Sequence, residues 1–423
     1  MFLSEKEKVT VMLKVLFLVN KYKPDILANS ICIQNVVEKL ATQKIEIHIL
    51  AATGNSALPA YEQSENVHIY RVLSKSEEYD MECHIQTNKK HKPLKLLRNL
   101  IIYKLIWPAL FIDVYCELKK RASSIIRKHK CCAVVSCSGD FLSQIIGYEM
   151  KKKYKSIKWV PYFNDPLPMA NRFYNKRIST IFNLKKAEKR VFKFADKILM
   201  EKNLVDYYRT NNIRGENKII TVGVPLFVRS DFIRSKPTGD KVTLVFIGSI
   251  DRINRNPEYL FEVLHKSKAD FQFFIYGACS CKDLIARYDT KTSGRIQYMG
   301  VIPHETVMEI MEMANFLVNI CNTVSFQIPS KILEYMGTGL PIINVVKDKN
   351  DSTIEIINKY GNGINILENS TTDESVSTLD AFLKSNRGKT ASTDSMSNEF
   401  KIYDPEYTSR AILASITQDA RHI

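Results

Sequence analysis

Short apolar runs alternate with amphipathic stretches along most of the chain. In the first half, the runs are VMLKVLFLVN, IEIHILAAT, CCAVVSCSG, SIKWVPYFND and FADKILM. Segments with apolar residues at helical spacing, such as NSICIQNVVEKLATQ, separate them. The second half repeats the rhythm with KVTLVFIGS, DFQFFIYG, IQYMG, NFLVNIC and LPIINVV. Strands that alternate with helices of ten or more residues predict parallel sheets covered on both faces.

The chain is too long for one ordinary core, because it has 423 residues. We therefore expect an α/β protein of two Rossmann-like domains that face each other across a cleft. The expected N-terminal domain spans 1–225, the expected C-terminal domain spans 226–390, and 391–423 form a loop and a closing helix. We expect that helix, EYTSRAILASITQ, to cross back to the N-terminal domain. The segment 385–398 is polar and is predicted to be loop.

The net positive charge of the chain comes entirely from its first half. Residues 1–240 carry 42 Lys and Arg against 23 Asp and Glu, whereas residues 241–423 carry 19 against 22. A basic surface suits nucleic acid, anionic lipid or phosphorylated substrates. We discount nucleic acid, because no aromatic–basic platform and no groove-reading helix is recognisable.

Residues 94–128 mix apolar and aromatic residues with Lys and Arg. They suit a pair of interfacial membrane helices, and equally an amphipathic helix packed on the sheet. We expect no membrane-spanning helix and no export signal, because Lys14 interrupts the first apolar run. Its residues Val11–Val19 are predicted to be a buried strand. Nine cysteines without a disulfide or zinc framework favour a reduced cytosolic setting.

The stretch IPSKILEYMGTGLPII suggests a phosphate site. Pro329 and Ser330 favour the start of a helix, and Lys331 then lies in its first turn. A cation is disfavoured at that end of the helix dipole unless an anion joins it. Glu334 shares a helix face with Lys331 and could accept two ribose hydroxyls, although a plain surface ion pair is the alternative.

A second turn of the same kind follows the run VTLVFIG. Gly248 closes that strand, and Arg252 and Arg255 lie between it and the next helix. Two helix N-termini with Arg255 and Lys331 would form a diphosphate pocket that requires no metal. The chain contains no Asp-x-Asp pair, which agrees with neutralisation by protein cations. We therefore expect neither a metal nor a cofactor.

These motifs resemble the donor half of GT-B glycosyltransferases, most closely the retaining group called family 4 and its PSK-x-x-E subgroup. The resemblance is carried by VFIGSIDRINRNPEYL, FFIYG, YMGVIPHETVMEIMEMANFLV, PSKILEYMGTGLPII and KYGNGINI. It is strong over about 241–367 and weaker through the N-terminal half.

The resemblance implies roles residue by residue. Gly248 and Arg255, with Arg252, would hold the donor diphosphate. Pro329, Ser330 and Lys331 would bind it from the helix N-terminus, Glu334 would bind the ribose, and Gly300, Val301 and Ile302 would border the nucleobase. Asn164 and Asp165 would face the transferred sugar as the catalytic candidates.

Three departures from the family pattern are visible. Phe326 stands where many relatives have a first glutamate, KYKPDILANS lacks the Gly-Gly of many relatives, and Ser249 replaces a basic residue. The PSK subgroup commonly lacks the first glutamate. Arg252 could substitute for the basic residue.

The leading hypothesis is a retaining, metal-independent transferase of the hexosyltransferase type. It would use a nucleotide sugar, UDP before GDP, and a lipid-linked or growing glycan acceptor in cell-surface polysaccharide biosynthesis. We expect a cytoplasmic protein at the anionic inner face of the cell membrane. The alternatives are a non-catalytic partner of the same fold and a sugar-nucleotide epimerase, for which only His304 stands at a plausible position.

Overall fold

The protein divides into two compact units, each built around its own sheet. The computed structural model describes residues 12–25, 27–74, 112–137, 141–164, 188–210, 215–228, 241–323, 328–392 and 399–417. The first unit combines Met1–Pro225 with Pro405–Ile423, and the second is Leu226–Asp404. The segment 391–423, expected as a separate third part, is therefore divided between the two units. Residues 391–404 belong to the second unit, and the closing helix belongs to the first.

The first unit has an eight-stranded sheet of order β3-β4-β2-β1-β5-β6-β7-β8, in which only β3 runs antiparallel to its neighbour. Its central strands are mostly buried on both faces and are therefore mostly apolar, as LKVLFLV and AVVSC show. The strands are β1 (Leu13–Val19), β2 (Ile45–Thr53), β3 (Tyr61–Ser64), β4 (Val67–Leu73), β5 (Ala133–Cys137), β6 (Lys158–Phe163), β7 (Ile198–Glu201) and β8 (Ile219–Val222).

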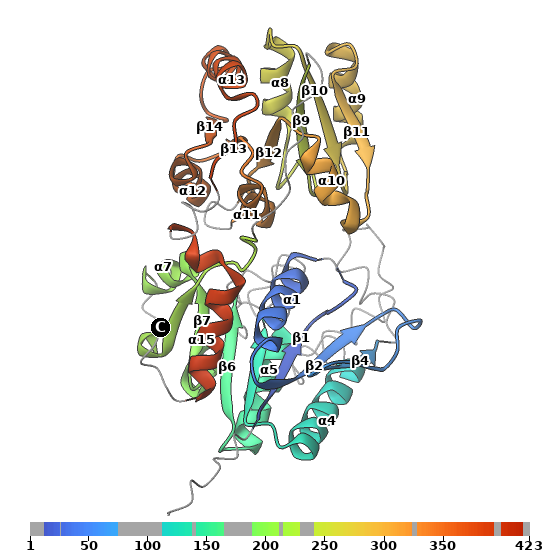
Figure 1. The fold of residues 1–423 in the computed structure, drawn as a ribbon, viewed down its shortest axis with the longest axis vertical. Helices are drawn as coiled ribbons and strands as arrows, with labels where there is room; N and C mark the ends of the chain where they lie inside the picture. Colours follow the sequence, from blue (N-terminus) through green and yellow to red (C-terminus); the bar gives the residue numbers. More distant parts are fainter. Residues whose placement is uncertain are drawn as a thin grey trace, which may run out of the picture. The chain divides into compact units, whose positions relative to one another are not determined.

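Helices cover this sheet, and one of them comes from the end of the chain. The helices are α1 (Ala28–Ala41), α4 (Ile112–His129), α5 (Phe141–Lys153), α7 (Lys202–Thr210) and α15 (Pro405–Thr417), with the 3-10 turn η2 (Glu216–Lys218). Figure 1 shows α15, in red, beside the blue α1. Ala411, Ile412 and Ile416 of α15 join the core of the first unit. The expected return of the closing helix is thus confirmed.

The helix α4 contains the described part of the ambiguous segment 94–128. Its buried residues Val114, Leu118, Ala122 and Ile125 recur at helical spacing. The helix packs against β1, β2, β4 and α5. The buried face of α4 therefore packs on the sheet as core, whereas 94–111 lie outside the described residues. None of the helices that the structure describes is long and apolar enough to cross a bilayer.

The second unit has a six-stranded sheet of order β11-β10-β9-β12-β13-β14, with every pairing parallel. The strands are β9 (Val242–Ile247), β10 (Phe271–Tyr276), β11 (Ile296–Gly300), β12 (Phe316–Ile320), β13 (Ile342–Val346) and β14 (Gly363–Leu367). The helices are α8 (Glu258–Lys266), α9 (Lys282–Lys291), α10 (Val307–Glu312), α11 (Ser330–Gly337), α12 (Ser352–Tyr360) and α13 (Thr372–Asn386), with the 3-10 turns η3 (His304–Thr306) and η4 (Lys401–Tyr403).

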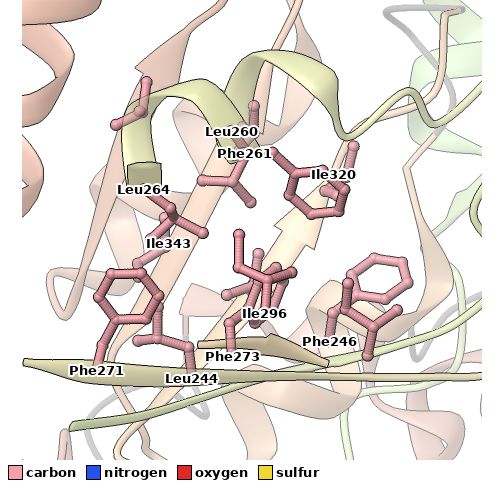
Figure 2. Close-up of a cluster of buried hydrophobic side chains, with 14 of the residues drawn as sticks. Leu244, Phe246, Leu260, Phe261, Leu264, Phe271, Phe273, Ile296, Ile320 and Ile343 are labelled. Carbon is pink, nitrogen blue, oxygen red and sulfur yellow. The ribbon is translucent and has the colours of Figure 1, made fainter. Parts of the chain in front are cut away.

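One core cluster of the second unit lies between its sheet and the helices α8, α9 and α13. Phe261 and Leu264 of α8 meet Phe273 of β10 and Ile343 of β13 in this core (Figure 2). One expectation needs correction. Ser385 and Asn386 are helical rather than loop, because α13 begins with a capping box formed by Thr371 and Glu374 and runs on to Asn386. The cysteines of the described residues are all free thiols.

Candidate active site

The candidate donor site lies at the carboxyl edge of the second sheet, where the strand order reverses. Counted along the chain, the order is 3-2-1-4-5-6, so that β9 and β12 are neighbours at the topological switch point. Open α/β sheets bind ligands outside the carboxyl ends of the strands at such a point. These two strands pair only at Phe316–Leu244 and Leu317–Val245. Beyond Val245, the backbone of β9 therefore needs another partner.

Tyr335 of α11 supplies that partner. Its hydroxyl accepts a hydrogen bond from the Ile247 N–H at 2.9 Å and donates to the Ile247 carbonyl oxygen at 3.2 Å. The side chain is fully buried, and this burial raises the pKa of the phenol well above its usual range. The contact fixes α11 one residue before the Gly248 turn. No local pattern indicates this role, because a tyrosine one turn after Lys331 resembles an ordinary core residue.

The N-terminus of α11 carries the PSK motif as expected. Pro329 is the N-cap residue, and no side chain caps the first N–H groups of the helix. Lys331 and Glu334 form an ion pair across one turn of the helix, and each side chain is 19% exposed. The pair alone does not distinguish a ligand site from a structural pair. Ser330 is half-buried at the first position of the helix.

Arg255 reaches the end of the neighbouring strand β12. Its Nε donates to the Asn322 Oδ1 at 3.0 Å, and its Nη1 lies 3.5 Å from the Ser249 hydroxyl. Gly248 belongs to the same corner, since a Cβ added there would lie 3.4 Å from the Arg255 Nη1. The guanidinium thus lies between the Gly248 turn and Asn322, the second residue after β12. Of the two predicted arginines, Arg255 is the one tied to the switch point.

Arg252 forms a different contact. It pairs with Asp283 in the first turn of α9, and its hydrogen bond holds the pKa of that exposed carboxyl below its usual range. The predicted contact of Arg252 with the diphosphate would require this pair to open, and it stays a prediction.

Glycines close the other strands of this edge. The Gly248 N–H donates to the Tyr276 carbonyl oxygen at 2.9 Å, and the Gly277 N–H donates to the Gly300 carbonyl oxygen at 2.7 Å. Gly300 is thereby fixed at the end of β11, while Val301 after it is exposed and Ile302 is half-buried. The three predicted nucleobase neighbours therefore lie at the same sheet edge as Gly248.

Lys347 is a further cation at this edge that the sequence analysis missed. It follows β13 directly, and its Nζ donates to the Asn254 carbonyl oxygen at 2.9 Å and the Thr323 hydroxyl at 3.1 Å. These contacts tie the loop of Arg255 to the ends of β12 and β13. The signal was available, because Lys347 follows the run LPIINVV just as Gly248 follows VTLVFI.

The first unit contains the acceptor-side candidates. Asn164 follows β6 at the carboxyl edge of its sheet, and its Nδ2 lies 3.4 Å from the Asn29 Oδ1 in the first turn of α1. The loop before α1 thus does begin a helix without the Gly-Gly of many relatives, with the Asp25 Oδ1 accepting from the Leu27 N–H at 2.9 Å. Asp165 and Phe326 lie outside the described residues.

Together, the described residues of the second unit suit a doubly charged anion. The uncapped N–H groups of α11, the cations Arg255, Lys331 and Lys347, and the glycine turn of β9 lie at the carboxyl edge of one sheet. Charge-assisted hydrogen bonds from such groups stabilise the negative charge that develops on a departing diphosphate.

Comparisons with known proteins agree with this geometry. Residues 241–384 match the family Glycosyl transferases group 1. No curated protein matches the chain significantly.

Solved structures match almost the whole length of the chain. Sucrose-phosphate synthase from Thermosynechococcus elongatus has a TM-score of 0.65 at 12% identity, over 96% of this chain and 98% of that one. Anabaena Alr3699/HepE in complex with UDP and glucose has a TM-score of 0.61 at 11% identity, over 96% and 100%. The lipopolysaccharide outer core galactosyltransferase WaaB, in its apo form, has a TM-score of 0.59 at 15% identity, over 96% and 99%.

The expected glycosyltransferase class and GT-B fold of two Rossmann-like domains are thus confirmed. The PSK-x-x-E subgroup and the roles of single residues stay predictions.

Proposed function

We propose that this glycosyltransferase of GT-B fold moves a sugar from a nucleotide diphosphate sugar, with UDP as the nucleotide, to a lipid-linked or growing glycan acceptor. The observation that carries the proposal is the double hydrogen bond between Tyr335 and Ile247, which holds the N-terminus of α11 beside the Gly248 turn. The Anabaena structure with UDP and glucose, which shares the fold, supports UDP.

The residues of this chain suggest how the donor would bind. Arg255 and Lys331 would contact the diphosphate, and Glu334 would release part of its ion pair to accept the ribose hydroxyls. The cations and the α11 dipole would then stabilise the charge that accumulates on the leaving diphosphate. With that stabilisation on the leaving-group side, the acceptor hydroxyl would attack from the same face and retain the configuration. This scheme requires neither a metal nor a protein nucleophile.

The acceptor and the cellular setting rest on the first unit. Its excess of Lys and Arg would attract an anionic membrane surface, which suits a lipid-linked acceptor in cell-surface polysaccharide biosynthesis at the cytoplasmic face of the membrane. The fold shared with the lipopolysaccharide galactosyltransferase WaaB supports a glycan acceptor. Asn164 would approach the transferred sugar, and Asp165 is the second catalytic candidate.

Calorimetric titration with UDP and with GDP, without divalent metal, tests the donor site. We expect Lys331→Ala to weaken the binding of the preferred nucleotide by about 1–3 kcal/mol, because a charge-assisted hydrogen bond is lost. The matched control is Lys359→Ala, which removes a lysine from another Lys–Glu helix pair of the same unit. This control should leave the affinity unchanged.

Two outcomes would contradict the proposal. Equal effects of the two variants would make Lys331 a structural residue. Absence of nucleotide binding, with or without magnesium, would favour a non-catalytic partner of the same fold.

A further inference from the structure

Three histidines and one glutamate cluster at the amino ends of strands in the first unit. Glu46 and His48 lie in the first half of β2, His68 lies at the second position of β4, and His129 ends α4. Parallel sheets of this class bind substrates at the opposite, carboxyl edge. The cluster is therefore separate from the candidate active site, and the proposed function gives it no role.

The histidines converge on one oxygen of Glu46. The Glu46 Oε1 lies 2.9 Å from the His48 Nε2, 3.6 Å from the His129 Nδ1 and 3.8 Å from the His68 Nε2. The ligand atoms of Glu46, His48 and His129 all lie within 4.8 Å of one another. Ligands of tetrahedral zinc are separated by about 3.3 Å, as bond lengths near 2.05 Å imply. The distances between these ligand atoms, from 2.9 Å up to 4.8 Å, include that value.

Tyrosine hydroxyls face the other ring nitrogens. The Tyr70 hydroxyl lies 3.4 Å from the His48 Nδ1 and 3.3 Å from the His129 Nε2, and the Tyr61 hydroxyl lies 2.9 Å from the His68 Nδ1. Metal-bound histidines have this arrangement, with one nitrogen on the metal and the other held by a hydrogen-bonding group.

Lys14 orients the carboxylate from the side. Its Nζ lies 2.7 Å from the Glu46 Oε2, and its side chain is 35% exposed. The lysine therefore leaves the Oε1 directed at the histidines, and part of its charge remains in contact with solvent.

His48 is the buried group that requires a partner. Its side chain has no exposed surface, and its Nε2 forms no hydrogen bond of acceptable geometry within the described residues, although the Glu46 Oε1 is near. A buried polar atom without a partner is costly.

We propose that Glu46, His48 and His129 bind a structural zinc ion or a similar divalent transition metal, with His68 in place as the fourth ligand. Imidazole and carboxylate ligands suit zinc, and four protein ligands would close the coordination sphere as in structural sites. The ion would fasten the C-terminus of α4 to β2 and β4. This site is independent of the donor diphosphate, for which we expect no metal.

Metal analysis of the full-length protein tests the proposal. Chelator-treated protein would be incubated with zinc chloride, dialysed and analysed for zinc, and its Tm would be compared with that in EDTA. We expect one tightly bound zinc per chain and a rise in Tm of about 5 °C. Cobalt in place of zinc should give the visible spectrum of a tetrahedral nitrogen–oxygen site, without thiolate charge transfer in the near ultraviolet.

Variants connect the metal to these residues. His129→Gln, at the end of α4, should lower the zinc affinity at least as far as the roughly 10- to 100-fold seen for lost supporting contacts, and Glu46→Gln should do the same. His304→Gln, in the second unit, is the control. Zinc content or a Tm response of His129→Gln equal to that of the control would overturn the proposal. Absence of tight zinc in the wild type, or a thiolate cobalt spectrum, would do so even if a variant failed to fold.

Discussion

Gly277 lies so close to Gly248 that a Cβ on it would stand 2.1 Å from the Gly248 carbonyl oxygen. The backbone of Gly277 also has a φ of +122°, in a region that L side chains rarely adopt. Glycine is required here both by space and by conformation. Since Gly248 lies at the switch point, this contact fixes the turn of the candidate donor site.

Gly277→Ala should therefore destabilise the second unit by about 3 kcal/mol or more, through strain and overpacking together, and should abolish nucleotide binding. Gly294→Ala is the matched control, since Gly294 has a φ of +83° but open space around its Cβ. It should lose only about 1–2 kcal/mol and keep the affinity. Urea denaturation and calorimetry measure both effects. Similar losses of stability in the two variants would show that backbone strain alone, and not the close contact with Gly248, makes glycine necessary at Gly277.

Tyr335→Phe should lower the free energy of unfolding by about 1–3 kcal/mol, because the buried N–H of Ile247 would be left unpaired. It should also weaken nucleotide binding, because α11 loses its anchor to β9. Tyr360→Phe removes another buried hydroxyl that donates to a carbonyl, that of Leu340 at 2.7 Å. That variant should lose stability but not affinity. An unchanged affinity of Tyr335→Phe would mean that packing alone positions α11.

The two arginines should differ in their effect on the donor. Arg255→Ala should weaken binding of the preferred nucleotide about 10- to 100-fold, the size expected for lost charge-assisted contacts. Arg252→Ala should change it about 3-fold or less, because Arg252 pairs with Asp283 on the surface. Calorimetric titration of each variant with the nucleotide measures the dissociation constant relative to that of the wild type. The reverse order would place the diphosphate on the α9 side of the turn.

Asp351 should make stability depend on pH. It caps α12 by accepting from the Thr353 N–H, and burial raises the pKa of its carboxyl. Because the folded state raises this pKa, it binds the proton of Asp351 more tightly than the unfolded state does. The stability that Asp351 contributes is therefore fully present below the unfolded-state pKa, near 4, and is lost as the pH rises through the folded-state pKa. Asp351→Asn should therefore keep the cap and flatten the loss of stability as the pH rises above about 4.

Asp351→Ala is the matched comparison for that experiment. It removes the cap itself and should be about 1–2 kcal/mol less stable than Asp351→Asn at every pH. Chemical denaturation across this pH range separates the two variants. A parallel decline of wild type and Asp351→Asn would assign the pH dependence to another group.

Ile412→Ala should destabilise the first unit by about 2–5 kcal/mol, because Ile412 is fully buried in its core. Hydrogen exchange followed by mass spectrometry should show faster exchange in β1, β2 and β6 and unchanged exchange in the second unit. Ile253→Ala, at an exposed position, is the control. Equal acceleration in both units would show that they unfold together.

The sequence predicted the strands of both sheets well where burial on two faces makes them mostly apolar, as in β1 and β13. It missed β3 and β4, because YEQS and VHIYRVL are only partly buried and resemble surrounding loop. The PSK helix was predicted from Pro329, Ser330 and the later glycines, which are local signals.

Local signals of this kind could not predict the long-range contacts that assemble the two sites. Tyr335 and Ile247 are 88 residues apart, and no periodicity connects them. The histidine cluster joins two strands and a helix whose histidines follow no metal-binding spacing. The sheet register places His48 opposite His68, and the packing of α4 on β2 and β4 adds His129.

The placement of α15 has a consequence for biosynthesis. The chain leaves the first unit at Pro225 and returns to it at Pro405, so the ribosome delivers all of the second unit before the last piece of the first. Domains usually fold as units in the order of their synthesis. Here that order is reversed, because the N-terminal unit cannot close its core until α15 emerges. Until then, the apolar surface that Ala411 and Ile412 will cover stays open to chaperones.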